Sequence, residues 1–396
     1  MLRLGQFTDT FLPIVDGVGR VVYAYADTLC KMGHQVTVVA PMYDTGFQGG
    51  FPFHLVEFMG RGVPGMKQYR VGEAVWDHHY RRRMRMTELD LIHCHSPFTA
   101  GSEALRLCAL RKLPLVGTFH SKYYDDFLKA TKSESLARMG TKFVVNFFNR
   151  CDEVWAVGKS AGDVLKDYGY RGEVQIMPNG ATLRTVSPSD VAEVERRFRL
   201  EDGLPVILFV GQMNWKKNIL AVLGACAEMK RAGRAFHLLL AGQGPDMREI
   251  DQKVHDLNIQ DRTQLLGHIT DASLLDALYA RASVFAFPSL YDNTPMVVRE
   301  AAVMGTPSVM VRGSTAAEGI EDRVNGFLCE DDPGDLCRVI CGALDDPVLL
   351  AAAGEKARET IPVPWERILE NAVSRYERLI ALSREGRLKD KRMRIV

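Results

Sequence analysis

Short apolar runs alternate with amphipathic stretches over most of this 396-residue chain, and this alternation constrains the fold more than any other feature. Strands buried in parallel sheets form nearly continuous apolar runs, whereas covering helices repeat apolar residues every three to four positions. The pattern therefore predicts βαβ units and parallel sheets covered by helices. Because one hydrophobic core rarely serves a chain of this length, we expect two domains.

The predicted strands fall into two series, which divide the chain into halves. Those of the first half are residues 2–7, 35–40, 89–94, 114–117 and 153–157. Those of the second half are residues 206–210, 237–241, 264–266, 283–287 and 308–311, after which we expect only helices. Residues 178–204 have the composition of a linker region, and residues 41–80 show no clear periodicity. We therefore expect an α/β fold of two Rossmann-like, doubly wound domains, which bind ligands beyond the carboxyl ends of their strands.

The composition excludes several classes of protein. A net charge of +1 gives no reason to expect a nucleic-acid partner. No apolar run approaches the roughly 20 residues that span a bilayer, and the N-terminal segment is too short and strand-like for a signal peptide. The eight cysteines are scattered through apolar segments without zinc-ligand spacing. We therefore expect free thiols in the cytosol and no metal site.

The stretch at residues 287–307 combines a strand end, a polar turn and a helix start. Asn293, Thr294 and Pro295 are typical of such a start, with a hydroxyl or amide at the N-cap and proline at the first helical position. The free N–H groups of a helix start bind anions, and Glu300 beyond them is placed to accept the hydroxyl groups of a ribose or a sugar. The alternative is an ordinary capped helix with a solvated glutamate.

Another strand end carries groups that suit a diphosphate. The strand at residues 206–210 leads into Gly211 and Gln212, and then into the cationic pair Lys216 and Lys217. Lysine suits a diphosphate because it is a mobile point charge, and cations at a helix start oppose the helix dipole unless an anion binds. A solvated helix start is the alternative.

Three glycine-rich or backbone features are weaker candidates. Gly242 follows a strand and lets a ligand approach the backbone, although glycine-rich turns close many strands. The backbone edge that ends at Ile269 offers a surface for a flat base. In the first half, Asp16-Gly17-Val18-Gly19 resembles an anion cradle at a helix start but lacks the GxGxxG pattern and the following acid of an NAD site.

Histidines and arginines supply the remaining candidates. His120 comes directly after a predicted buried strand, where α/β sheets form their binding sites. His93 and His95 lack a third metal ligand at a recognisable spacing, so we expect structural roles for them. One basic cluster consists of Arg81, Arg82, Arg83 and Arg85, and a second occupies residues 387–394. Such clusters are usually solvated faces, but they also suit an anionic membrane surface, at about 1 kcal/mol per charge.

These features together resemble the retaining glycosyltransferases of family 4, which have the GT-B fold, along nearly the whole chain. The most specific match is to the family element Pro-Ser-x-x-Glu-x7-Glu, where Asp292 takes the place of the first acid and Glu300 that of the second. Other matches are Gly17-Val18, Gly33-His34, His120, Pro178-Asn179-Gly180, Gly211, Lys217 and Gly242-Gln243-Gly244-Pro245. The resemblance implies two domains that face each other across a cleft. They are residues 1–185, which would bind the acceptor, and 186–371, which would bind the nucleotide sugar, with a C-terminal helix at about 372–396 packed on the first.

The resemblance also implies roles by position. Glu300 would hold ribose hydroxyl groups, Lys217 would neutralise the diphosphate, and Asp292 would contact hydroxyl groups of the donor sugar. His120 would lie beside the reacting sugar, and Gly17 would let the first loop close on the diphosphate. The other residues expected to contact the donor are Gly211, Gln212, Lys216, Gly242, Ile269, Asn293, Thr294, Pro295 and Met296.

Two residues depart from the family pattern. Gln212 stands where the family usually has arginine, so leaving-group stabilisation would rest more on Lys217, with Lys216 near it. Asp292 shortens the reach toward the sugar by one methylene. The resemblance implies a front-face substitution in which the leaving phosphate accepts the proton of the incoming hydroxyl, without a metal or other cofactor.

Residues 118–127 indicate the acceptor, because they look like the Thr-aromatic-His and Tyr-acid-acid-aromatic run of diacylglycerol glucosyltransferases in this family. Together with the basic clusters, they favour transfer from UDP-glucose to a lipid such as diacylglycerol, by a cytoplasmic protein at the inner face of the plasma membrane. The alternatives are a soluble sugar or a cell-surface polysaccharide intermediate as acceptor, or a non-catalytic scaffold that binds sugar or lipid.

Overall fold

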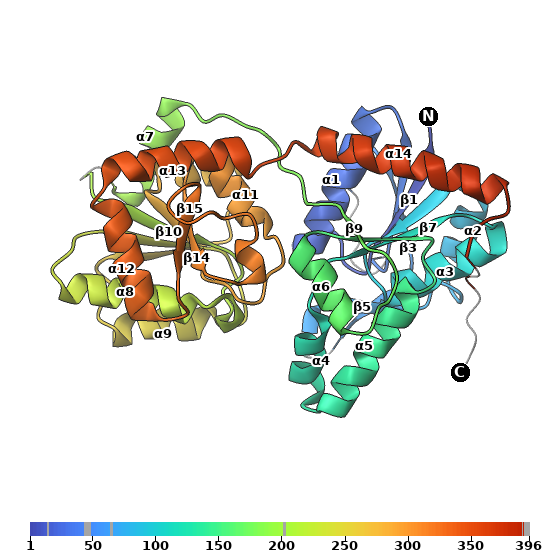
Figure 1. The fold of residues 1–396 in the computed structure, drawn as a ribbon, viewed down its shortest axis with the longest axis horizontal. Coiled ribbons are helices and arrows are strands. Elements are labelled where there is room, and N and C mark those ends of the chain that lie inside the picture. Colours follow the sequence, from blue (N-terminus) through green and yellow to red (C-terminus); the bar gives the residue numbers. More distant parts are fainter. Residues whose placement is uncertain (14–15, 43–48, 64–65, 201–202, 390, 392–396) are drawn as a thin grey trace. The chain divides into compact units, whose positions relative to one another are not determined.

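The computed structural model describes residues 1–13, 16–42, 49–63, 66–200, 203–389 and 391. It forms two compact units, and Figure 1 shows their elements. Unit 1 consists of Met1–Asn179 and Trp365–Val396, and unit 2 of Gly180–Pro364. These divisions lie a few residues before the expected ones at 185/186 and 371/372. Among the described residues, no helix is both long enough and apolar enough to cross a membrane.

Unit 1 is built on a seven-stranded sheet in the order β3-β2-β1-β6-β7-β8-β9, in which every pairing is parallel. Its strands are β1 (Arg3–Phe7), β2 (Gln35–Ala40), β3 (His54–Glu57), β6 (Leu91–Cys94), β7 (Leu115–Phe119), β8 (Glu153–Ala156) and β9 (Gln175–Ile176). The chain progresses from β1 toward one edge and then returns to β6 on the other side of β1. This reversal is the topological switch point at which doubly wound sheets bind ligands.

Helices and one hairpin complete unit 1. The helices are α1 (Gly17–Lys31), α2 (His78–Met86), α3 (Thr99–Arg111), α4 (Tyr123–Thr131), α5 (Glu134–Phe148), α6 (Lys159–Asp167) and α14 (Trp365–Arg384), and the antiparallel hairpin consists of β4 (Gly60–Val63) and β5 (Met66–Gly72). Although α14 is the last helix in the described part of the chain, it lies against α1, the first (Figure 1).

Unit 2 has a six-stranded parallel sheet in the order β12-β11-β10-β13-β14-β15, which again places the switch point beside its first strand. Its strands are β10 (Val206–Val210), β11 (His237–Ala241), β12 (Thr263–Gly267), β13 (Val284–Ala286), β14 (Ser308–Val311) and β15 (Gly326–Cys329). Its helices are α7 (Pro188–Phe198), α8 (Ile219–Arg231), α9 (Met247–Asp256), α10 (Ala272–Arg281), α11 (Met296–Val303), α12 (Pro333–Leu344) and α13 (Pro347–Thr360).

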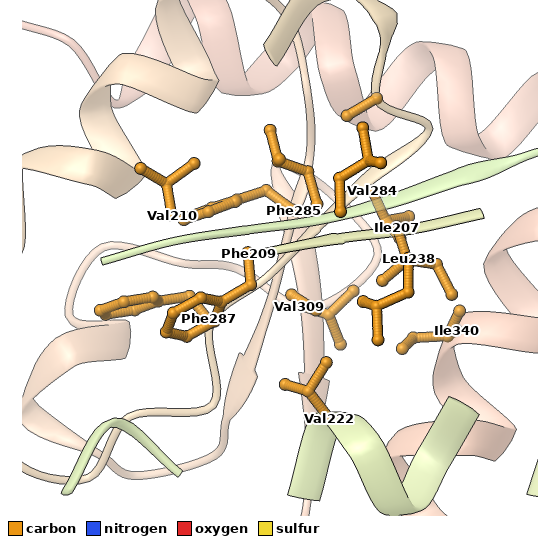
Figure 2. Close-up of a cluster of buried hydrophobic side chains, with 14 of the residues drawn as sticks. Ile207, Phe209, Val210, Val222, Leu238, Val284, Phe285, Phe287, Val309 and Ile340 are labelled. Carbon is orange, nitrogen blue, oxygen red and sulfur yellow. The ribbon is translucent and has the colours of Figure 1, made fainter. Parts of the chain in front are cut away.

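The core of unit 2 forms where the sheet meets its helices. Figure 2 shows side chains of β10, β11, β13 and β14 packed together with Val222 of α8 and Ile340 of α12. Ile207, Phe209 and Phe285 are completely buried, which is expected for strands covered on both faces. This packing fixes the strand ends from which the candidate site is built.

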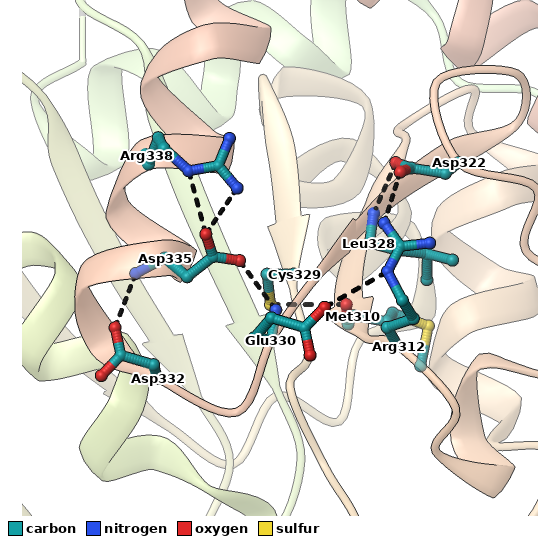
Figure 3. Close-up of polar contacts among 9 residues, drawn as sticks. All are labelled: Met310, Arg312, Asp322, Leu328, Cys329, Glu330, Asp332, Asp335 and Arg338. Atoms are coloured by element: carbon teal, nitrogen blue, oxygen red, sulfur yellow. Dashed lines mark hydrogen bonds and ion pairs between the residues drawn. The ribbon is translucent and has the colours of Figure 1, made fainter.

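Two expectations about unit 2 were wrong. After β14 the chain does not continue only in helices, because β15 forms the edge of the sheet. Figure 3 shows how polar contacts hold this short strand, with Asp322 accepting a hydrogen bond from the Leu328 amide and Asp335 accepting one from the Glu330 amide. The expected linker at residues 178–204 contains α7, whose start has a capping box formed by Ser187 and Asp190.

Glu153 on β8 ties α14 to the sheet of unit 1. Its carboxylate accepts hydrogen bonds from the guanidinium groups of Arg375, at 2.6 Å, and Arg378, at 2.7 Å, and its side chain is only 8% exposed. Between these arginines, Tyr376 stacks on Trp155 with ring centroids 5.5 Å apart. The contacts join segments more than 200 residues apart in sequence.

We predict that Glu153→Gln lowers the free energy of unfolding of unit 1 by about 1–3 kcal/mol, because two charge-assisted hydrogen bonds weaken and two arginines lose their counter-charge. Urea unfolding measures the change. Glu385→Gln is the control, because Glu385 pairs with Arg387 on the surface, where an ion pair contributes less than about 1 kcal/mol. Equal losses for the two variants would contradict the proposed anchoring role.

Candidate active site

The switch point of unit 2 brings two loops together. The loop after β10 leads into a short 3₁₀ helix, Trp215–Lys217, and the loop after β13 contains Asp292. Because β10 and β13 are paired in parallel, their carboxyl ends lie at the same edge of the sheet. The Lys217 Nζ atom consequently lies 2.5 Å from Asp292 Oδ1, and both side chains are mostly buried.

Hydrogen bonds fix the loop that carries Asp292. The Ser289 hydroxyl donates to Asp292 Oδ2 at 2.6 Å, and the Thr315 hydroxyl donates to the Asp292 carbonyl oxygen at 2.7 Å. Both carboxylate oxygens of Asp292 therefore have a partner within unit 2. The resemblance implied that Lys217 contacts the diphosphate and Asp292 the sugar of the donor. It did not indicate that these two side chains pair with each other.

A second lysine borders this pair. The Lys216 Nζ atom lies 4.5 Å from the centroid of the Tyr291 ring, and Lys217 Nζ lies 5.7 Å from it. An aromatic face at this distance attracts a cation. The tyrosine and the aspartate thus hold two ammonium groups at one strand end, which creates a local concentration of positive charge suited to a diphosphate.

The expected cap of α11 was wrong. The N-cap residue is Pro295, which supplies no side-chain hydrogen bond, and the helix begins at Met296. Thr294 has a φ angle of +40°, in the left-handed region, so it cannot occupy the extended conformation of an N-cap side chain. The first N–H groups of α11 therefore receive no acceptor from the cap residue, which leaves the anion-binding character of a helix start in place.

Glu300 lies on the inner face of α11. It is 9% exposed, and the Tyr279 hydroxyl, from α10, lies 3.4 Å from its Oε2 atom. Burial raises the pKa of Asp276; the charge of Arg184 opposes this shift, and the charge of Glu300 adds to it. A mostly buried carboxylate at this position suits hydroxyl groups, which donate strong hydrogen bonds to it.

The glycines predicted near the donor have a clear structural reason. Gly242 has a φ angle of +142°, and a Cβ atom built there would lie 1.8 Å from the carbonyl oxygen of Gly211. Only glycine therefore allows the loops after β10 and β11 to approach this closely. Of the neighbouring candidates, Gln212 is exposed and Ile269 is partly buried against the core.

His120 and its neighbours form a buried network in unit 1. His120 follows β7, and its Nε2 atom lies 3.0 Å from Nδ1 of His95, whose Nε2 atom lies 2.8 Å from the Gln6 side-chain oxygen. His93 lies between the hydroxyl groups of Tyr376 and Thr118, at 2.7 and 2.6 Å. His93 and His95 are completely buried, in keeping with the structural roles expected for them.

The start of α1 differs from the expected anion cradle. Asp16 is the N-cap, and its own carboxylate accepts a hydrogen bond from the Gly19 amide at 2.7 Å and one from the Thr10 hydroxyl at 2.8 Å. Gly17, the first residue of the helix, is exposed, and a Cβ atom there would meet nothing within 4 Å. A carboxylate of the protein thus occupies the position in which an external anion was expected.

The arginine cluster lies away from these strand ends. Arg81, Arg82, Arg83 and Arg85 belong to α2, and Arg82 and Arg83 help to line a cavity of about 560 Å³ with Arg3 and His54, at the amino ends of β1 and β3.

Across the described ranges of the chain, no group of three or more His, Cys, Asp or Glu side chains is arranged to hold a metal ion. Sequence reasoning missed Thr315 and Tyr279, which are unremarkable in sequence and gain their roles only from tertiary contacts. It included Ser289 in the matched Pro-Ser element but did not indicate that this hydroxyl holds Asp292.

We predict that stability falls when the pH drops below about 6.5. Burial lowers the pKa of His120 to about 3 and the pKa values of His93 and His95 well below 6.5. These histidines stay neutral in the folded protein but protonate in the unfolded chain, so their contribution is complete above pH 6.5. Below it, the free energy of unfolding decreases by up to about 1.4 kcal/mol per pH unit for each histidine.

Urea titrations between pH 7.5 and 4.5 measure this slope. His120→Gln should make the slope shallower by the share of one histidine, whereas His78→Gln, at an exposed position, should leave it unchanged. A slope that is the same in all three proteins would contradict a neutral, buried His120.

Two family patterns match most of the chain. The pattern described as "Glycosyltransferase Family 4" matches residues 15–184, and the pattern described as "Glycosyl transferases group 1" matches residues 190–360. An alpha-monoglucosyldiacylglycerol synthase of Acholeplasma laidlawii is 21% identical over 393 residues, which cover 96% of this chain and 98% of the relative. Another, from Streptococcus pneumoniae, is 25% identical over 340 residues, which cover 83% of this chain and 75% of the relative.

Solved structures show the same fold. A sucrose-phosphate synthase from Thermosynechococcus elongatus superposes with a TM-score of 0.79 at 19% identity, over 96% of this chain and 100% of that one. Anabaena HepE, crystallised with UDP and glucose, superposes with a TM-score of 0.74 at 19% identity, over 95% of this chain and 99% of that one. The two family patterns show that the chain is a glycosyltransferase whose residues 15–184 belong to glycosyltransferase family 4. The two parallel Rossmann-like sheets and the superpositions show that it has the GT-B fold.

Proposed function

We propose that this glycosyltransferase moves glucose from UDP-glucose to the hydroxyl group of a lipid, diacylglycerol, with retention of the anomeric configuration. The observation that carries the proposal is the pair of lysines held by Tyr291 and Asp292, a few residues before α11, whose start has no side-chain cap. The relatives support the lipid and the sugar, because two of them are named alpha-monoglucosyldiacylglycerol synthases. UDP is bound in the HepE structures, which share the fold.

The donor would replace a contact that the protein makes with itself. Asp292 forms an ion pair with Lys217. A bound diphosphate offers Lys217 more negative charge than one carboxylate does, so the lysine would turn to the phosphates. Asp292 would then accept hydrogen bonds from hydroxyl groups of the sugar, while Ser289 and Thr315 keep its loop in place.

Other groups near the same strand ends of unit 2 would also contact the donor. Glu300 would accept hydrogen bonds from the ribose hydroxyl groups, and Lys216 and the first N–H groups of α11 would add to the neutralisation of the diphosphate. The neutral His120 would contact the reacting sugar through a hydrogen bond, because its lowered pKa keeps it uncharged. Charge neutralisation by the lysines and amides is the basis for proposing a reaction without a metal ion.

We propose a front-face substitution. The bond between the anomeric carbon and the diphosphate oxygen breaks, and the acceptor oxygen bonds to the same face of that carbon. The proton of the acceptor hydroxyl passes to the leaving phosphate oxygen, so the protein need not supply a base. Catalysis then rests on positioning and on preorganised positive charge, which together account for large rate enhancements in enzymes.

Lys217→Gln tests this function. Transfer of radiolabelled glucose from UDP-glucose to 1,2-dioctanoylglycerol should fall at least about 100-fold in kcat, because an electrostatic contact to the leaving group is lost. Lys230→Gln is the matched control, because Lys230 also pairs with an aspartate at 2.5 Å, on the surface of unit 2. Full activity of Lys217→Gln, or no transfer by the wild type with any UDP-sugar, would overturn the proposal.

A further variant, Glu300→Gln, tests the contact of Glu300 with the nucleotide. Calorimetry should show that Glu300→Gln binds UDP about 10- to 100-fold more weakly than the wild type, which corresponds to the loss of a charged hydrogen bond. Unchanged UDP affinity would remove Glu300 from the proposed site.

A lipid acceptor requires a surface that meets the membrane, and we propose α2 and the turn before it. Arg82, Arg83 and Arg85 are exposed, and the neighbouring Trp76 and Met86 are 76% and 83% exposed. Exposed cations beside large apolar side chains are typical of proteins that bind anionic bilayers at the interface.

Vesicle sedimentation tests the surface. Arg82→Glu with Arg85→Glu should weaken binding to vesicles that contain anionic lipid by more than 10-fold, since each arginine near such a surface contributes about 1 kcal/mol. Lys356→Glu, an exposed position on α13, is the control. Equal binding of all proteins, or equal binding to neutral vesicles, would contradict an electrostatic membrane surface on α2.

A further inference from the structure

Asn218, the residue after Lys217, joins three strand ends of unit 2. Its side-chain nitrogen donates one hydrogen bond to the carbonyl oxygen of Pro288, at 3.1 Å, and another to Asp331 Oδ1, at 2.8 Å. Asn218 lies in the connection after β10, Pro288 follows β13, and Asp331 follows β15. Because β13 and β14 lie between β10 and β15 in the sheet, one amide group links loops from both ends of this four-strand row.

The partners of this amide group fix its orientation. A carbonyl oxygen and a carboxylate oxygen only accept hydrogen bonds, and the two N–H bonds of one amide nitrogen match two acceptors. Asparagine at a helix start usually accepts a hydrogen bond from the first N–H groups of that helix. Asn218 is the N-cap residue of α8, but within the described ranges its side chain makes no cap hydrogen bond with α8. The side chain therefore serves the strand ends.

The backbone at Asn218 also determines where Lys217 lies. Asn218 has a φ angle of +57°, in the left-handed region that glycine and asparagine adopt more readily than other residues. Its amide donates a hydrogen bond to the Trp215 carbonyl oxygen, and the Lys217 amide donates one to the Asn214 carbonyl oxygen, both at 2.9 Å. The lysine backbone is thus held between a tight turn and the Asn218 side chain.

Two links join the connection after β10 to the loop after β13. The first is the ion pair between Lys217 and Asp292, at 2.5 Å. The second is the hydrogen bond from Asn218 to Pro288, which directly precedes Ser289, the residue whose hydroxyl holds Asp292. When a diphosphate draws Lys217 away from Asp292, as proposed above, the first link opens. The second link then keeps the two loops in register.

We propose that Asn218 is a positioning residue for Lys217, which keeps the lysine beside the donor diphosphate by fastening the connection after β10 to the ends of β13 and β15. The inference deepens the proposed function and rests on it. A lysine side chain is long and flexible, so the place of its backbone limits where it delivers its charge. A misplacement of about 1 Å in such a contact can lower the rate by about 100-fold.

The test measures the affinity for UDP by calorimetry, without an acceptor, so that donor binding is read separately from turnover. Asn218→Gly keeps the left-handed backbone, because glycine adopts it readily, and it removes both side-chain hydrogen bonds. It should weaken UDP binding about 10-fold, because the ammonium group of Lys217 is no longer held at the diphosphate.

A double-mutant cycle shows whether this loss passes through the lysine. In Lys217→Gln the ammonium group is absent, so adding Asn218→Gly to that variant should change UDP affinity by less than about 2-fold. A residue that only stabilised unit 2 would weaken UDP binding by the same factor whether or not Lys217 is present. The cycle therefore distinguishes a positioning role from a structural one.

Asn258→Gly is the matched control. Asn258 is another asparagine of unit 2 in the left-handed region, with a φ angle of +54°, but it is exposed and follows α9. It should leave UDP affinity unchanged in the wild type and in Lys217→Gln. Asp331→Ala supplies a second variant with an unaltered backbone at Asn218. Because it removes one of two acceptors, it should show coupling to Lys217→Gln of the same sign as Asn218→Gly but smaller.

The outcomes separate the two proposals. UDP affinity that depends on Asn218 only when Lys217 is present, in a protein that transfers no glucose, would uphold the positioning role and overturn the transfer reaction. Unchanged UDP affinity in Asn218→Gly, or equal losses with and without Lys217, would overturn the positioning role and leave the reaction standing. An equal loss in Asn258→Gly would show that glycine at a left-handed position, rather than the lost hydrogen bonds, weakens binding, which also overturns the inference.

Discussion

The pairing of β10 with β13 is the constraint on which the candidate site depends. In a doubly wound sheet, the first strand lies in the middle, and the chain returns to its other side after building one edge. The carboxyl ends of β10 and β13 are therefore neighbours although the loops that follow them are far apart in sequence. Lys217 and Asp292 meet at 2.5 Å for this reason, across 75 residues of chain.

The sequence predicted the strands that this constraint involves, because they are buried on both faces and consist of apolar residues. Four of them, β2, β10, β11 and β14, have the predicted bounds. It failed for β15, an edge strand of four residues that begins with Gly326 and that polar contacts of Asp322 and Asp335 hold in place. It also failed for α7, whose capping box lies in a stretch that is linker-like in composition. Short polar elements owe their stability to contacts that periodicity does not record.

The candidate site could be predicted only as a set of strand ends. His120, Lys217 and Asp292 could be identified as candidate site residues because each follows a predicted buried strand. The resemblance to family 4 then added a role for each of them. It was not enough to show that Lys217 and Asp292 pair, or that Pro295 rather than Asn293 or Thr294 occupies the N-cap of α11.

The two switch points differ in charge, and this difference supports the proposed placement of the two substrates. In unit 2 the strand ends carry two lysines and the start of α11, which has no side-chain cap, and both features suit a diphosphate. In unit 1 the strand ends carry Asp9 and Asp16, together with histidines that burial keeps neutral. Carboxylates in a low-dielectric site repel an anion strongly but accept hydrogen bonds from neutral hydroxyl groups. Electrostatics therefore supports the proposal that a nucleotide sugar binds at unit 2 and an uncharged alcohol at unit 1.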